Sequence, residues 1–80
     1  MIRFTAHALE ALQRRAIDVE WVEQTLRDPQ RRETDPTDLG VMRSFRAFSE
    51  ADGRVLRVVH RSEQEDVVVI TAFFDRGAKS

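Results

Sequence analysis

The sequence predicts an α+β fold in which an N-terminal pair of helices packs on a twisted antiparallel sheet of three to four strands. Apolar residues recur at helical spacing early in the chain and at a spacing of two from Val41 onward. An Asp52-Gly53 pair, a strong hairpin signal, separates the first two alternating segments. A meander must bury one face, and the helix pair is the only cover available. We therefore expect a single domain, residues 1–80.

The first half of the chain carries the signals for both helices. Thr5 is a good N-cap for a helix over about residues 6–14, and Asp18 is a good N-cap for a second helix over about residues 19–27. Pro29 ends the second helix, because the residue before a proline avoids helical angles.

The remaining elements follow from turn residues and from the change of period. Residues 2–4 are expected to form a short strand or an extended entry, and residues 30–40 a polar loop that includes a short strand at 31–34. The last strand is rich in valine and isoleucine, which favours a central place in the sheet. The strands of the meander are expected at residues 41–49, 54–61 and 66–75, followed by a frayed tail at 76–80.

Composition limits the classes of function. The net charge is −1, from 13 basic and 14 acidic residues, which argues against a nucleic-acid field over the whole protein. Twelve of the basic residues are arginine, the planar partner of phosphates and carboxylates, although a high-GC genome would also enrich arginine. Cysteine is absent, so no disulfide or Cys-based zinc site is expected. No signal-peptide pattern and no membrane-spanning run is found, and a cytoplasmic location is expected.

Alternation sorts the strand residues into two faces. The uncharged Leu56 and Val58 predict that their set, which includes His60, lies under the helices. Two interpretations of the opposite face stay open: a surface for a phosphate-bearing or acidic partner, or a solvated face on which arginine stems cover valines. That face is expected to show Arg46, Arg57 and Arg61 among Val55, Val59, Val69 and Phe73.

One further pattern resembles a known family. The run Phe4-Thr5-Ala6-His7-Ala8-Leu9-Glu10, followed by Arg14-Arg15-Ala16-Ile17 and Asp28-Pro29, is similar to the opening of small prokaryotic proteins grouped as domain of unknown function 4258 (DUF4258). Segments 56–59 and 67–73 resemble the strands of that family, so the resemblance extends from Phe4 to Phe74. The family in turn resembles the RelE/ParE toxin fold, with two helices on a twisted antiparallel sheet.

This resemblance implies a toxin of a type II toxin–antitoxin system, paired with a cognate antitoxin. Some members of the wider superfamily cut mRNA on the ribosome, others poison gyrase, and some are not toxins. The leading expectation is therefore a metal-independent endoribonuclease that binds RNA or the ribosome. The alternatives are a non-enzymatic module that receives a partner on the open sheet face or on the edge strand near residues 41–49, and a toxin that acts on a protein target.

RNA cleavage by internal 2′-hydroxyl attack needs a base, cations for the phosphorane charge and an acid for the leaving oxygen. Imidazole titrates near neutrality and supplies base or acid, and guanidinium groups supply the cations. No metal or cofactor is expected, because the two histidines show no ligand spacing and three glycines form no phosphate loop. His7 and His60 also have structural interpretations, as a capping residue and a half-buried residue. The candidate set is His7, Arg57 and His60 as catalytic residues, and Arg46, Arg61 and Arg43 as substrate-binding residues.

Overall fold

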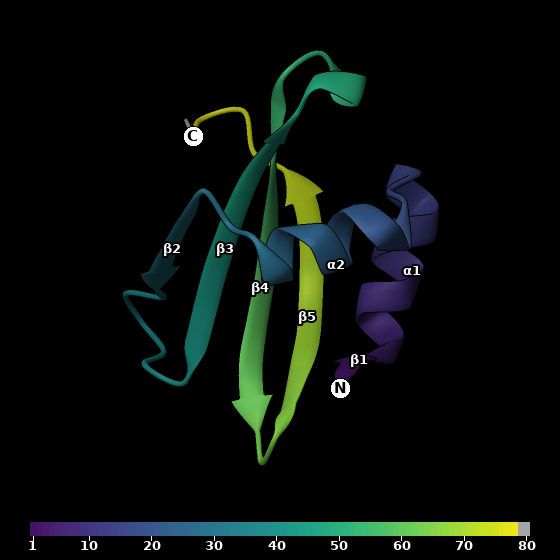
Figure 1. Ribbon diagram of the computed structural model, residues 1–80. Coiled ribbons are helices and arrows are strands. Elements are labelled where there is room, and N and C mark those ends of the chain that lie inside the picture. Colours follow the sequence, from purple (N-terminus) through teal and green to yellow (C-terminus); the bar gives the residue numbers. More distant parts are fainter. Residues whose placement is uncertain (79–80) are drawn as a thin grey trace.

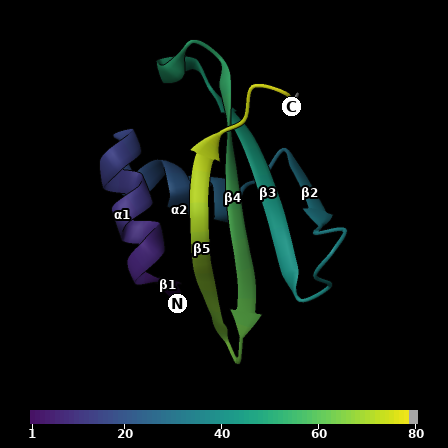
Figure 2. The same cartoon turned by 180° about the vertical axis from the view of Figure 1, so that it is seen from behind.

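The computed structural model describes residues 1–78 and has two layers, with both helices on one side of a five-stranded sheet. Helix α2 crosses the sheet and α1 lies beside β5, while the opposite face of the sheet is bare in the view from behind (Figures 1 and 2). The predicted α+β fold is confirmed, with more strands than expected. The elements are β1 (Ile2–Phe4), α1 (Ala6–Arg15), α2 (Val19–Arg27), β2 (Arg31–Thr34), β3 (Val41–Phe48), β4 (Arg54–Glu63) and β5 (Asp66–Phe74).

The strand order is β1-β5-β4-β3-β2. Three pairings are antiparallel, as predicted, but β1 runs parallel to β5, so the sheet is mixed. The short β2 pairs with β3, which makes β2 the edge strand in place of β3. The expected edge near residues 41–49 is therefore wrong.

Both helices begin at the predicted caps. The Thr5 side chain accepts a hydrogen bond from the Ala8 N–H, and Asp18 accepts one from the Glu20 N–H. Helix α1 ends at Ala16 in the left-handed region (φ 53°), whose N–H donates to carbonyls of the last turn. The next N–H, of Ile17, donates to the Leu12 carbonyl at 2.9 Å, which closes the turn into α2.

The β3–β4 hairpin closes through a short 3₁₀ turn at Ser49–Ala51 followed by Asp52 and Gly53, which both have positive φ. The Gly53 N–H donates to the Phe48 carbonyl at 2.9 Å, as the Asp-Gly signal predicts for a tight return. At the C-terminal end, residues 75–78 form a turn in which the Ala78 N–H donates to the Asp75 carbonyl at 3.3 Å. The other two residues of the predicted tail, 79–80, lie outside the described residues.

A β-bulge in β5 overturns one predicted face. Val59 pairs with Thr71 and the next residue, His60, pairs with Val69, so Ile70 has no partner in β4. The extra residue shifts the alternation. Val69 consequently lies in the core and is fully buried, and its predicted place on the open face is wrong.

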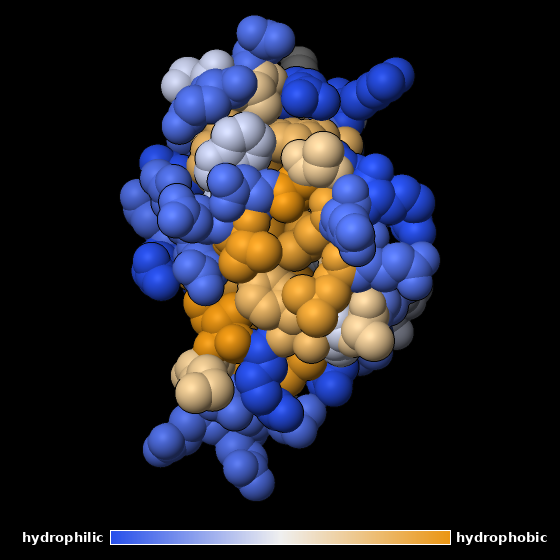
Figure 3. All heavy atoms as spheres, turned by 90° about the vertical axis from the view of Figure 1, so that its right-hand side faces the viewer, coloured by the Kyte–Doolittle hydropathy of each residue, from blue (hydrophilic) through white to orange (hydrophobic). Residues whose placement is uncertain are grey.

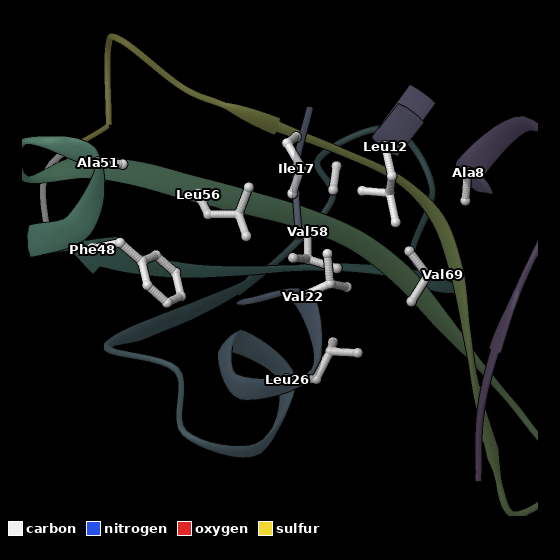
Figure 4. Close-up of a cluster of buried hydrophobic side chains, with 11 residues drawn as sticks. Ala8, Leu12, Ile17, Val22, Leu26, Phe48, Ala51, Leu56, Val58 and Val69 are labelled. Atoms are coloured by element: carbon white, nitrogen blue, oxygen red, sulfur yellow. The ribbon is translucent and has the colours of Figure 1, made fainter. Parts of the chain in front are cut away.

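The core lies between the helices and one face of the sheet (Figure 4). Leu56 and Val58 are fully buried there, as predicted. Trp21 of α2 stacks on Phe48 with ring centroids 5.1 Å apart and meets Phe74 edge-on at 6.1 Å. The buried cluster consists of Ala8, Leu12, Ile17, Val22, Leu26, Phe48, Ala51, Leu56, Val58, Val69 and Ala72.

The exposed Ala16 gives a test of the α1 terminus. We expect Ala16→Gly to stabilise the fold by about 0.5–1 kcal/mol, because glycine removes the left-handed penalty and its own entropic cost is smaller. Urea unfolding measures the change. Gln13→Gly, at an exposed helical position, should destabilise by about 0.5–1 kcal/mol. Equal signs for the two variants would contradict the assigned C-cap.

Candidate functional site

The sheet face turned away from the helices, called here the open face, carries three of the predicted site residues. Register pairs Arg57 with Phe45 on β3 and with Phe73 on β5. Arg61 pairs with Val41 on β3, and Arg43 pairs with Val59 on β4. The placement of Arg57 and Arg61 on this face agrees with the prediction.

One row of side chains crosses the open face from strand to strand. Arg31 of β2, Phe45 of β3, Arg57 of β4 and Phe73 of β5 are successive register partners. The guanidinium carbons of Arg31 and Arg57 lie 4.2 and 5.7 Å from the Phe45 ring centroid. Arg57 also lies 5.3 Å from the Phe73 centroid, and Arg15 of α1 lies 5.8 Å from it. All four distances are within the range of cation–π attraction. These five residues are called the arginine–phenylalanine row.

The row explains how apolar residues on a sheet face without a helix over it are shielded from water. Phe45 is only 2% exposed, although no helix among residues 1–78 covers it. The guanidinium groups of Arg31 and Arg57 lie over the Phe45 ring and limit its contact with water. The open face is therefore an apolar layer under guanidinium groups.

Ion pairs hold several of these guanidinium groups in place. Arg57 donates to Asp75 at 2.8 Å, and this hydrogen bond lowers the pKa of the Asp75 carboxyl below its ordinary value. Glu63 accepts from Arg3 at 3.0 Å and from Arg61 at 3.2 Å, and these hydrogen bonds, led by that of Arg3, lower its pKa.

Arg43 is held on two sides, by Glu33 at 3.2 Å and Asp35 at 3.1 Å. Asp35 also accepts hydrogen bonds from the Thr37 N–H at 2.9 Å and the Thr37 hydroxyl at 2.8 Å. These bonds from Thr37, followed by the one from Arg43, lower the pKa of Asp35 to about 2. Arg43 thus anchors the loop that follows β2.

Two members of the row lack a carboxylate. Within residues 1–78, neither Arg15 nor Arg31 has a carboxylate oxygen within 4.0 Å. Arg15 donates instead to the Ala72 carbonyl at 3.0 Å, on the edge of β5. Arg31 is exposed. No hydrogen bond within residues 1–78 engages its guanidinium group, so its donors are available to an incoming anion.

Arg46 lies on the helix side of the sheet, so its predicted place on the open face is wrong. Its register partner is Leu56, and its guanidinium donates to the Asp28 carbonyl at 2.8 Å and to the Asp28 carboxylate at 3.2 Å. The positive charge there meets the negative C-terminal end of α2. Arg46 therefore closes a helix terminus and stands apart from the arginine–phenylalanine row.

His60 lies on the helix side, as predicted, and is only 6% exposed. Its Nε2 is 2.8 Å from the hydroxyl of Ser44. Burial, and secondly the charge of Arg32, lower the pKa of His60. A serine beside a histidine is the pair that nucleophilic catalysis uses. Ser44, however, is fully buried, so its hydroxyl has no access to a substrate.

The three candidate catalytic residues occupy separate places. His7 is exposed in the first turn of α1, Arg57 lies on the open face, and His60 is buried on the helix side. A general base must lie within hydrogen-bond reach of the proton that it takes. The structure brings Arg43, Arg57 and Arg61 onto one face, but it places neither His60 nor Arg46 with them.

Three members of the row were missed from the sequence: Arg15, Arg31 and Phe45. Arg31 follows the second helix in a segment that was expected to be mainly loop, and Arg15 belongs to a helix. Phe45 lies on the same face as Arg43, and the prediction that put Arg46 on the open face assigned this pair to the opposite, helix-covered face.

A second surface with apolar character lies on the side of the molecule that carries α1. Figure 3 shows apolar side chains gathered at the centre of that side, with hydrophilic residues around them. The large exposed hydrophobic residues of the helices are Leu9 of α1 and Val19 of α2, at 52% and 41% exposure.

Within residues 1–78, no group of three or more His, Cys, Asp or Glu side chains is placed to hold a metal ion. No helix in that range is long and apolar enough to cross a membrane.

The buried His60 predicts a pH-dependent stability. Its pKa is lowered in the folded state, so the unfolded chain binds the proton more readily. The free energy of unfolding should therefore fall as the pH drops below about 6.5, by at most about 1.4 kcal/mol per pH unit for this group. Urea unfolding between neutral and mildly acid pH measures the slope.

The two histidines supply matched variants for this measurement. His60→Gln keeps a hydrogen-bonding group beside Ser44 and should remove the slope that His60 contributes, whereas His7→Gln should retain it. If the pH dependence of stability were lost in His7→Gln and kept in His60→Gln, it would arise from His7, and the prediction for His60 would be wrong.

Comparison with known proteins gives the chain a family. A search of curated proteins and a search of solved structures each found no match. The likeness to RelE/ParE toxins therefore stays a prediction. The family model described as "Domain of unknown function (DUF4258)" matches residues 4–74, which include both helices and the strands that carry the arginine–phenylalanine row. The chain belongs to the DUF4258 family.

Proposed function

We propose that this protein is a non-enzymatic protein-binding module whose open face receives an acidic segment of a partner protein. The observation that carries the proposal is the arginine–phenylalanine row on a sheet face that no helix among residues 1–78 covers. Guanidinium heads above aromatic rings suit a segment in which carboxylates alternate with apolar side chains.

The charges of the open face favour a protein over RNA as the partner. Binding to a nucleic-acid backbone draws on surplus positive charge, and this protein has a net charge of −1. Glu33, Asp35 and Asp75 lie among the arginines of the face. A protein segment can avoid these carboxylates by placing its own acidic residues only over Arg31 and other accessible guanidinium groups.

The separation of the histidines supports a non-enzymatic role. His60 lies on the other side of the sheet from Arg57, and its ring is hydrogen-bonded to the hydroxyl of the buried Ser44. A base on one face of a sheet does not serve a phosphate held on the other.

The nature of the partner follows from the family resemblance. The resemblance to RelE/ParE toxins implies a cognate antitoxin as this partner, and an acidic segment of that antitoxin would cover the open face. A small acidic or DNA-binding protein encoded beside this chain is the candidate to examine.

A defined probe tests the proposal. A short synthetic peptide that alternates glutamate and leucine should bind in a saturable way by calorimetry, and a lysine–leucine peptide should not. Arg31→Ala should weaken the binding about tenfold, because it removes a charge-assisted hydrogen bond. Arg31 has no carboxylate within 4.0 Å among residues 1–78, so this change breaks no ion pair there.

The matched control is Arg27→Ala, which removes an exposed arginine from α2 on the helix side of the sheet. It should leave the affinity unchanged. Equal affinities for the Arg31→Ala and Arg27→Ala variants, or equal binding of the two peptides, would refute recognition at the open face.

RNA cleavage is the second candidate function, favoured by Arg57 on an uncovered face and by the exposed His7. On this hypothesis, induced expression arrests growth, the purified protein cuts RNA, and His7→Ala and Arg57→Ala each abolish the cutting. The binding proposal predicts that RNA stays intact with all three proteins. Growth arrest with intact RNA points to a protein target such as gyrase. Cleavage retained in both variants would refute the assigned catalytic residues.

A further inference from the structure

The margin of the sheet formed by β2 is uncovered. No helix or strand within residues 1–78 lies beyond it (Figure 1). Near the opposite margin, two carbonyls of β5 already accept hydrogen bonds, because the Thr5 hydroxyl donates to Ile70 at 3.3 Å and Arg15 donates to Ala72 at 3.0 Å. An uncovered strand edge is a template for pairing with another chain. The β2 edge is therefore the place at which a further strand can be added.

The residues of β2 alternate in the direction of their main-chain groups. In an antiparallel pair, residues that exchange two hydrogen bonds alternate with residues that exchange none. The Asp35 N–H donates to the Val41 carbonyl at 2.8 Å and continues the β2–β3 register, so every second residue back from Asp35 bonds to β3. The N–H and C=O groups of Arg32 and Thr34 consequently face away from β3, at the uncovered edge.

The side-chain charges change sign along β2. Arg31 begins the strand, Glu33 lies near its end and Asp35 follows it, and all three lie on the open face. Arg31 has no carboxylate oxygen within 4.0 Å among residues 1–78. Charged residues commonly keep an edge strand from pairing. Against an antiparallel copy of β2, however, the positive start of one strand meets the negative end of the other.

We propose that two copies of this protein associate through β2, with the two strands antiparallel and a two-fold axis at Glu33. Arg32 of each copy then exchanges both main-chain hydrogen bonds with Thr34 of the other. Arg31 of each copy lies opposite Asp35 of the other, which supplies a carboxylate to that guanidinium group. The two five-stranded sheets join into one, with both open faces on the same side.

Charge and hydrogen bonding select this register over its neighbours. A two-fold axis between two residues would set an outward-facing residue against an inward-facing one, so the axis must lie at a residue. At Arg32 it would bring together two arginines that have no carboxylate oxygen within 4.0 Å among residues 1–78. At Thr34 it would set Glu33 against Asp35 twice. At Glu33 the two like charges are each held by Arg43 of their own chain at 3.2 Å.

Sedimentation equilibrium of the full chain, combined with amide hydrogen exchange measured by NMR, tests the proposal. A contact of one strand pair buries little area, so the dimer should be weak and should form between about 10 μM and about 1 mM. Exchange of the Arg32 and Thr34 amides should slow as the dimer forms, whereas the Glu33 amide, already bonded to β3, should change less. A protein that stays monomeric at about 1 mM, or a dimer in which the Arg32 and Thr34 amides exchange as in the monomer, would overturn the proposal.

A proline variant tests the main-chain hydrogen bonds. Thr34→Pro removes an outward-facing N–H and should raise the dissociation constant of the dimer at least about tenfold, because the two-fold axis counts the loss twice. Proline is compatible with an edge strand when its missing N–H faces away from the sheet. Glu33→Pro is the matched contrast, since it removes a donor to β3 and should destabilise the fold itself. A folded Thr34→Pro protein that dimerises as the parent does would overturn the proposal.

A charge variant tests the same edge without a change to the main chain. Arg31→Glu breaks no ion pair within residues 1–78, sets a carboxylate against Asp35 of the second copy and should weaken the dimer at least about tenfold. The control is Arg14→Glu, which reverses an exposed charge of α1 on the β5 side of the sheet and should leave the dimer unchanged. Equal dimerisation of the two variants would also count against the β2 contact. Thr34→Pro keeps every arginine of the row, so failure of the acidic peptide to bind would refute the proposed function and leave the dimer result unchanged.

Discussion

Two short helices cover only one face of a five-stranded sheet, and this constraint governs the rest of the structure. An apolar side chain on the other face must find cover from the sheet itself. Phe45 finds it under Arg31 and Arg57, and Phe73 finds it under Arg57 and Arg15. The arginines act as a thin third layer, whose charged guanidinium groups lie over the rings and limit their contact with water. Stability and surface chemistry therefore depend on the same side chains.

The fold was predictable where a single local signal decides the outcome. Thr5 and Asp18 cap their helices, Pro29 lies just beyond the second, and Asp52-Gly53 closes the hairpin, each through geometry within a few residues. The parallel pairing of β1 with β5 joins segments at opposite ends of the chain, and no local pattern announces it. The bulge at Ile70, which has no partner in β4, is equally hard to predict, because no residue type around it marks an extra residue in the strand.

The candidate site was predictable only in part, for a related reason. β4 alternates cleanly between apolar and charged residues, so Arg57 and Arg61 were placed correctly. β3 does not, because Phe45 and Phe48 fall on opposite faces and both are buried. Burial of Phe45 comes from arginines on other strands, and alternation within β3 cannot reveal it. Arg15 reaches the face from a helix, which strand alternation does not describe at all.

The same constraint explains why a surface rich in ion pairs remains suited to binding. Exposed pairs such as those of Arg61 contribute about 0–1 kcal/mol each, so exchange of one carboxylate for another costs little. A partner of the proposed kind gains more by covering the half-exposed Phe73 and Val59, since each 100 Å² of apolar surface removed from water contributes about 2.5 kcal/mol. Charge then determines which segment fits, and the aromatic layer supplies the free energy that holds it. A face built only of charges would select a partner without retaining it, and a bare apolar face would retain partners without selecting among them.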